Sequence, residues 1–144
     1  MTPGQVDPQV VRRHLLALDD ALQRLRAHQG CTEGDLAVDG DRRWVVERGL
    51  QLCAQNALDV ATHIAAGLGH DVPDYASAID KLGDLGILPA EFAASFRGIA
   101  GFRNVVVHGY LGLDVSIVHR LLHSGLDDFV AFATHVNRHI GSAG

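Results

Sequence analysis

An all-α, up-and-down bundle of about five helices is the fold class that the sequence predicts. Apolar side chains recur at intervals of three and four along residues 8–28, 39–67 and 114–136, which is the spacing of helices with one buried face. Short segments with glycine and proline separate such stretches, as expected where one helix ends and the next begins. The length of 144 residues suits a single domain with a core over about residues 8–140.

The first half of the chain should form two long helices. The first is expected over residues 8–28, because an aspartate that can cap its start precedes a proline. Residues 30–40 are polar and contain glycine, which predicts a loop. The second helix should begin at Asp39 or Asp41 and end near residue 67.

The second half should add three helices. They are expected over residues 74–85, over residues 89–106 and from Asp114 onward, where the aspartate is a suitable cap. Gly98 and Gly101 fall inside the fourth helix, and each costs about 1 kcal/mol relative to alanine. This cost suggests that another helix or a bound partner approaches their backbone closely.

Composition and charge exclude several classes of protein. The net charge of −5 argues against nucleic-acid binding through a broad basic surface, although it leaves room for a local site. No apolar run approaches the roughly 20 residues of a membrane span and no signal peptide is recognisable, so we expect a cytoplasmic protein without membrane contact. Two isolated cysteines and two histidine pairs without a third ligand predict neither a metal site nor a cofactor.

The residues with the richest chemistry lie together in one segment, Gly101–Tyr110. Arg103 can hold a phosphate or an oxyanion through two parallel hydrogen bonds. His108 can give or take a proton near neutral pH. Asn104 and Tyr110 add an amide and a phenol, which makes this segment the candidate site.

Helical geometry restricts how these side chains can meet. Residues five apart point about 140° away from each other, so Arg103 and His108 do not share a face, whereas Asn104 and His108 do. The helix could end before His108, for which Gly109 is the usual signal. Otherwise the long arginine side chain could reach around the helix, or two copies of the chain could share one site. In a purely structural alternative, Arg103 is solvated and His108 caps the helix.

A row of hydrogen-bonding side chains follows one side of the second predicted helix. It comprises Arg48, Gln51, Gln55, Asp59 and His63. A solvated helix face would explain such a row. His63 could pair with Asp59, which lies four residues before it.

Three segments resemble one known family. The string from Phe102 to Tyr110 resembles the Arg-x4-His-x-Tyr motif of HepT-like ribonucleases, a branch of the HEPN superfamily of helical toxins. Residues 47–64 are similar to the second helix of that family, and residues 111–114 with the helix after them are similar to its last helix. The resemblance extends from about Trp44 to Val136 and implies a HEPN-like bundle.

The resemblance also implies a function. The protein would be the toxin of a type II or type VII-like toxin–antitoxin system, and it would cleave RNA as a metal-independent endoribonuclease. Arg103 would hold the scissile phosphate, His108 would move a proton, and Asn104 would orient the imidazole or the phosphate. In this family the second helix contributes to the active-site cleft and to the dimer interface. Its candidate cleft residues are Arg48, Asp59 and His63.

Partners follow from the same resemblance. HEPN ribonucleases are homodimers, and a minimal nucleotidyltransferase antitoxin of the MntA type silences the toxin by AMPylation of the tyrosine that matches Tyr110. A phosphate group there would repel RNA from Arg103. As an alternative, the chain could be a non-catalytic helical binding partner of a nucleotidyltransferase, a role that the presence of both Arg103 and His108 disfavours.

Overall fold

Eight α-helices and one π-helical turn make up the part of the chain that the computed structural model describes, residues 5–108 and 114–143; of residues 107, 108, 142 and 143 the backbone alone is described. The helices are α1 Pro8–Arg26, α2 Glu33–Val38, α3 Gly40–Gly67, α4 Tyr75–Asp84, α5 Ala90–Phe96, α6 Gly98–His108, α7 Val115–Arg120 and α8 Leu126–Ala143. The π-helical turn η1, Leu121–Gly125, joins α7 to α8. The predicted all-α bundle is confirmed.

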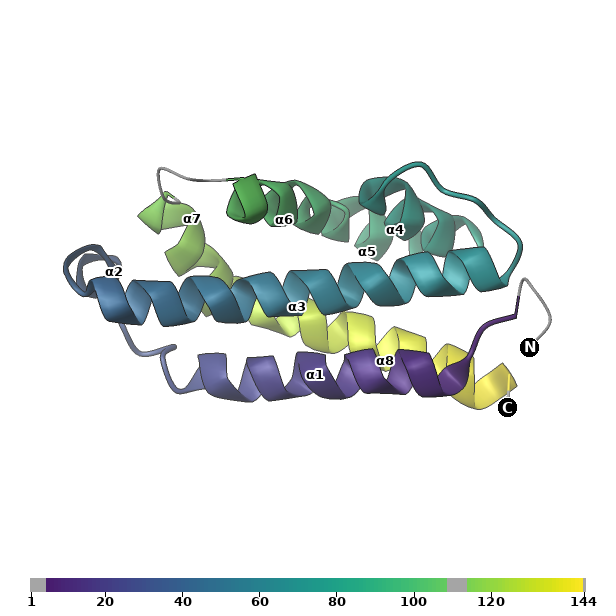
Figure 1. Ribbon diagram of the computed structural model, residues 1–144, viewed down its shortest axis with the longest axis horizontal. Coiled ribbons are helices and arrows are strands. Elements are labelled where there is room, and N and C mark those ends of the chain that lie inside the picture. Colours follow the sequence, from purple (N-terminus) through teal and green to yellow (C-terminus); the bar gives the residue numbers. More distant parts are fainter. Residues whose placement is uncertain (1–4, 109–113, 144) are drawn as a thin grey trace.

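The longest helix, α3, is the axis of the bundle. In Figure 1 it crosses the whole molecule, with α1 and α8 on one side and α4, α5 and α6 on the other. It packs against α1, α4, α6 and α8. Its buried side chains are apolar or small, and the burial of Cys53 raises the pKa of that thiol to about 12. Every helix that carries a candidate site residue is therefore positioned by α3 or belongs to it.

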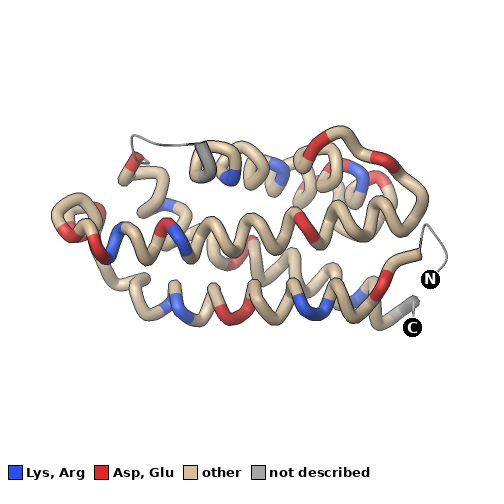
Figure 2. The backbone as a smooth tube through the Cα atoms, viewed as in Figure 1, with Lys and Arg blue, Asp and Glu red and all other residues tan. Residues whose placement is uncertain are grey.

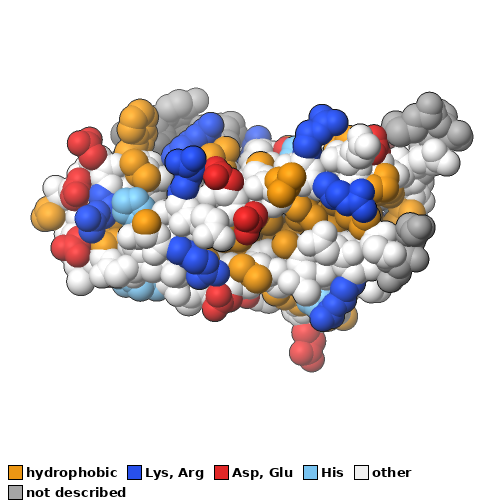
Figure 3. Space-filling view, turned by 90° about the horizontal axis from the view of Figure 1, so that it is seen from below, with side chains coloured by type: hydrophobic (Ala, Val, Ile, Leu, Met, Phe, Trp, Pro, Cys, Tyr) orange, Lys and Arg blue, Asp and Glu red, His pale blue; other side chains and the backbone are white. Residues whose placement is uncertain are grey.

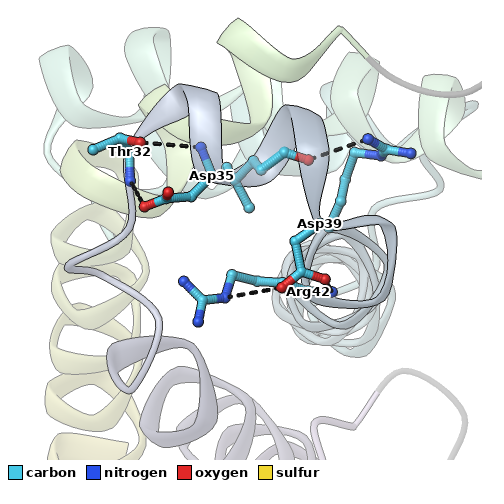
Figure 4. Close-up of polar contacts among 6 residues, drawn as sticks. Thr32, Asp35, Asp39 and Arg42 are labelled. Atoms are coloured by element: carbon cyan, nitrogen blue, oxygen red, sulfur yellow. Dashed lines mark hydrogen bonds and ion pairs between the residues drawn. The ribbon is translucent and has the colours of Figure 1, made fainter.

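The predicted loop over residues 30–40 is wrong, because it contains α2. A reciprocal capping box starts this short helix: Thr32 Oγ1 accepts a hydrogen bond from the Asp35 N–H at 3.0 Å, and Asp35 Oδ2 accepts one from the Thr32 N–H at 2.9 Å (Figure 4). The same backbone hydrogen bond lowers the pKa of Asp35. Asp39 ends α2 and caps α3, as one of the two predicted starts requires.

The fourth predicted helix, residues 89–106, is divided into α5 and α6. The division lies at Arg97, where the Ala100 N–H bonds to the Arg97 carbonyl in a tighter, three-residue turn. Arg97 also holds Asp80 of α4 through two hydrogen bonds of 2.9 and 3.2 Å. That contact raises the pKa of Arg97 and fixes the junction to α4.

The last predicted helix contains the π-helical turn η1. A π-turn leaves the normal pattern of backbone bonds incomplete, and here the side-chain amide of Gln29 donates to the Leu122 carbonyl at 3.1 Å. Beyond the turn, Phe129 and Phe132 of α8 pack with Phe96 of α5, with ring centres 5.7 and 5.1 Å apart. This aromatic contact joins α8 to the helix that leads into α6.

Charges of both signs are interspersed along the helices (Figure 2). The face shown in Figure 3 likewise mixes basic, acidic and apolar side chains without a continuous basic stripe. Within residues 5–108 and 114–143, no helix has both the length and the apolar character needed to cross a membrane.

The close approach of α1 and α3 predicts a stability effect at Gly49. A Cβ atom on Gly49 would lie 2.6 Å from Leu25 Cδ2 and 2.8 Å from Leu25 Cγ, and Leu25 is 1% exposed. We expect Gly49→Ala to lower the free energy of unfolding by about 1–3 kcal/mol through overpacking. Gly98→Ala is the control, because nothing lies within 4 Å of that position and alanine should gain up to about 1 kcal/mol. Urea denaturation measures both; equal effects of the two substitutions would contradict this packing.

Candidate functional site

Arg103, in the middle of α6, contacts three helices through its guanidinium group. Its Nε donates a hydrogen bond to Oε1 of Gln55 on α3 at 2.9 Å, and its Nη1 donates to Oδ1 of the neighbouring Asn104 at 3.2 Å. The guanidinium carbon lies 5.1 Å from the centre of the Tyr75 ring, at the start of α4. These contacts hold the guanidinium in one place.

Gln55 joins these helices because both ends of its amide are bonded. Its Oε1 accepts from Arg103, while its Nε2 donates to Asp59 Oδ1 at 2.8 Å and to Tyr75 Oη at 3.3 Å. The chemistry of the partners dictates this orientation, since an arginine nitrogen can donate only and an ionised carboxylate can accept only. Gln55 is therefore the residue that positions Arg103.

The partners of Arg103 leave its charge uncompensated. Its two hydrogen-bond acceptors are neutral amide oxygens. Four other arginines form ion pairs with aspartates: Arg24, Arg26, Arg42 and Arg97. Arg103 forms none with any described residue. A phosphate can bind such a guanidinium without displacing a carboxylate.

A cleft of about 640 Å³ opens beside Arg103. It is lined mainly by apolar side chains of α4, of α6 and of the segment before α4, and by the ring of Tyr75. Asp74, the N-cap of α4, is the acidic residue among its lining residues. Hydrogen bonds from Ser77 lower the pKa of Asp74, so it remains ionised at neutral pH.

A second cleft, of about 660 Å³, lies between the first half of α3 and the C-terminal half of α6. Arg48 lines it and donates to Gln51 Oε1 at 3.2 Å, again a neutral acceptor. Glu47 also lines it, and its Oε1 is buried without a hydrogen-bond partner in the described part of the chain. Burial raises the pKa of Glu47, an effect that the charge of Arg43 partly opposes.

The predicted cleft-wall residues have different surroundings. Asp59 reaches the Arg103 network through Gln55, and Arg48 belongs to the second cleft. The predicted pair of His63 and Asp59 is wrong, because His63 Nε2 accepts a hydrogen bond from the Asp7 backbone N–H at 2.9 Å. The imidazole thus binds the backbone of the segment that leads into α1.

The backbone of α6 continues through His108, so the first of the three alternatives, a helix that ends before this residue, is wrong. Positions 103 and 108 therefore lie about 140° apart around the helix axis. Asn104 is exposed beside Arg103 and bonded to it. Tyr110 lies outside the described residues.

Two residues of the site were not recognised from sequence. Gln55 belongs to the polar row of the second predicted helix, where the sequence gives it no particular role, and nothing in the sequence near Tyr75 points to Arg103. Their function depends on the pairing of α3 with α6 and α4, which brings together residues 48 and 28 positions apart from Arg103 in sequence. The local pattern of neither residue contains that information.

Within the described residues, no group of three or more His, Cys, Asp and Glu side chains is arranged to hold a metal ion. The arrangement around Arg103 suits binding of an anion by a guanidinium. Proton transfer at that anion would need a further group, for which the motif offers the imidazole of His108.

Comparison with known proteins gives a consistent picture. The family model of the HepT-like ribonucleases, described as "Ribonuclease HepT-like", matches residues 18–136. The tRNA nuclease HepT of Aphanizomenon flos-aquae is 25% identical over 137 residues, which cover 94% of this chain and 92% of that protein.

Solved structures share the fold at lower identity. A tri-AMPylated HEPN toxin of Shewanella oneidensis, in complex with its MNT antitoxin, superimposes with a TM-score of 0.78 at 20% identity, over 90% of this chain and 97% of that one. YutE of Bacillus subtilis, a cytosolic protein of unknown function, gives a TM-score of 0.82 at 17% identity, with 96% and 93% covered. These likenesses establish the helical arrangement.

Proposed function

The chain belongs to the family of HepT-like ribonucleases, and we propose that it is the RNA-cleaving toxin of a toxin–antitoxin pair. The observation that carries this proposal is the guanidinium of Arg103, which neutral amides hold at the edge of a cleft with its charge uncompensated. A phosphodiester is the ligand that such a group suits best. The name of the Aphanizomenon relative, a tRNA nuclease, supports RNA as the substrate class.

The proposed reaction needs no metal, because RNA carries its own nucleophile. The 2′-hydroxyl loses its proton and its oxygen bonds to phosphorus, the bond from phosphorus to the 5′-oxygen breaks, and that oxygen takes up a proton. The products are a 2′,3′-cyclic phosphate and a 5′-hydroxyl. Arg103 stabilises the negative charge on the phosphoryl oxygens, and His108 moves a proton to or from the reacting oxygens. Asn104 orients the phosphate beside Arg103.

A homodimer would complete this site. Since α6 continues through His108, positions 103 and 108 of one copy lie on different sides of the helix axis. Two copies that face each other along α6 could combine both groups and supply two imidazoles for the two proton transfers. Large exposed apolar side chains offer a surface for such a contact: Trp44 and Val45, which line the second cleft and are 76% and 50% exposed, and Val105 of α6, which is 55% exposed.

An MntA-like nucleotidyltransferase is the proposed antitoxin. The Shewanella toxin of the same fold is AMPylated in a complex with its MNT antitoxin. In this chain the tyrosine of the motif is Tyr110, two residues after His108. An AMP group on this tyrosine would add a negatively charged phosphate to the motif, and that charge would repel the RNA substrate.

Loss of either Arg103 or His108 tests the reaction. We expect Arg103→Ala and His108→Ala each to reduce RNA cleavage by about 10²–10⁴-fold, because each removes one stabilising or proton-transferring group. Arg24→Ala is the control, since this exposed arginine lies on α1 and pairs with Asp20. Cleavage is followed in the presence of a chelator, and end-group analysis identifies the 2′,3′-cyclic phosphate. Full activity of both variants, or cleavage that requires Mg²⁺, would overturn the proposal.

The same two variants test the shared site. When Arg103→Ala and His108→Ala proteins are unfolded together and refolded as a mixture, mixed dimers should recover part of the wild-type activity. Each protein refolded alone should stay inactive. If the mixture is as inactive as its components while sedimentation shows dimers, each copy would work with its own pair of residues.

The antitoxin proposal predicts the behaviour of Tyr110→Phe. This variant should cleave RNA normally yet resist silencing by a cognate nucleotidyltransferase and ATP, because it lacks the acceptor oxygen. Mass spectrometry detects the addition of AMP, and a cleavage assay detects silencing. Complete neutralisation of Tyr110→Phe would show that binding, and not modification, silences the protein. Tyr75→Phe is the control for a tyrosine outside the motif.

A further inference from the structure

The cleft beside Arg103 carries opposite charges on different helices. Arg103 contributes a cation from α6, and Asp74 contributes a carboxylate from the start of α4. The two do not form an ion pair. A carboxylate repels phosphate. If Arg103 binds the phosphate of a ligand, Asp74 is therefore suited to contact a different, uncharged part of that ligand.

The rest of the surface of this cleft is largely apolar. It includes the Tyr75 ring and the small or apolar side chains of Val72, Pro73 and Ala100. Proteins that bind single-stranded RNA hold unstacked bases on such surfaces and read their polar edges by hydrogen bonds. A volume of about 640 Å³ lies within the range of small-ligand sites.

Gly101 keeps this cleft open on the side of α6. The residue is exposed, lines the cleft, and has no atom within 4 Å of the position that a Cβ would take. The expectation that a neighbouring helix approaches Gly101 is therefore wrong. The open backbone surface leaves room for a ligand.

We propose that this cleft is a guanine-binding subsite, in which Asp74 accepts hydrogen bonds from the base while Arg103 binds the adjoining phosphate. The proposal rests on the ribonuclease function proposed above and specifies which nucleotide lies next to the scissile bond. Asp74 is thereby a specificity-determining residue.

Guanine follows from the hydrogen-bonding capacity of the carboxylate. Ionised Asp74 can accept only, and its two oxygens suit two adjacent donors. Guanine presents such a pair, N1–H and the 2-amino group. Adenine and cytosine place an acceptor nitrogen beside their amino group, and uracil flanks its one N–H with two carbonyl oxygens. The N-cap bond from the Ser77 N–H to Oδ1 is 2.8 Å long and fixes the carboxylate for this contact.

A pair of ligands that differ in one group tests the subsite without any cleavage. Guanosine and inosine monophosphates, each as the 3′ and the 5′ isomer, differ in the 2-amino group alone. For at least one isomer, wild-type protein should bind the guanosine compound about tenfold or more tightly than its inosine counterpart, the effect of one hydrogen bond to a charged group. Isothermal titration calorimetry gives both constants.

The substitution Asp74→Asn should reduce this ratio to less than about threefold, since an amide offers one acceptor and one donor. Asparagine is as good an N-cap as aspartate, so α4 should keep its start. Asp7→Asn makes the same chemical change at the N-cap of α1 and should leave the ratio unchanged. Arg103→Ala should weaken the binding of the guanosine compound and of the inosine compound by equal factors.

A pair of glycine substitutions tests whether binding occurs in this cleft. Gly101→Leu should fill the cleft and lower the affinity for guanosine monophosphate at least tenfold. Gly98→Leu alters the same helix at a position that also has open space but lines a different hollow, so it should change the affinity by less than about twofold. Thermal denaturation confirms that both variants fold.

The outcomes separate this inference from the ribonuclease proposal. If the protein prefers guanosine monophosphate through Asp74 but cleaves no RNA, the subsite is supported and the ribonuclease proposal is wrong. If the protein cleaves RNA but binds the guanosine and inosine compounds equally, the subsite proposal is wrong. Absence of measurable binding, or an unchanged ratio in Asp74→Asn, overturns the inference as well.

Discussion

The hydrogen bond from Arg103 Nε to Gln55 Oε1 is the contact on which the site depends. It is 2.9 Å long and joins α6 to α3 across 48 residues of sequence. A glutamate at position 55 could still accept from the guanidinium, but it would cancel its charge and would lose the hydrogen bond that Gln55 donates to Asp59. The amide holds the group and leaves the charge to the ligand. The second amide, of Asn104, acts on the guanidinium in the same way.

This contact is precise because α3 is held from several sides. Gly49 allows α1 to approach α3 closely. The contact of Phe96 with Phe129 and Phe132 joins α5 to α8 just before α6 begins. Arg97 and Asp80 then fix the junction of α5 and α6 to α4, which carries Tyr75 and Asp74. The helices that form the two sides of the cleft are thus fixed relative to each other by contacts outside it.

Sequence patterns predicted the helices because each is determined locally by its apolar spacing and its cap. They missed α2, whose reciprocal cap between Thr32 and Asp35 is local but lies inside a polar segment without an apolar period, and they miss contacts that a distant segment decides. The same limit applies to the site. The motif identified Arg103 as a candidate, but Gln55 and Tyr75 reach it through the packing of α3 and α4. His63, predicted to join them, binds the backbone of Asp7 instead.

The uncompensated charge of Arg103 is proposed to bind the phosphate of RNA. This can be measured as the affinity for a 2′-O-methyl RNA oligonucleotide, which cannot be cleaved, in wild type, Gln55→Glu and Gln23→Glu. Both substitutions make the net charge of −5 more negative by one, but Gln23 is exposed on α1. Because Gln55→Glu cancels the charge of Arg103, we expect at least a tenfold loss of RNA affinity for this variant and less than a twofold change for Gln23→Glu. Equal affinities of the two folded variants would contradict this proposal.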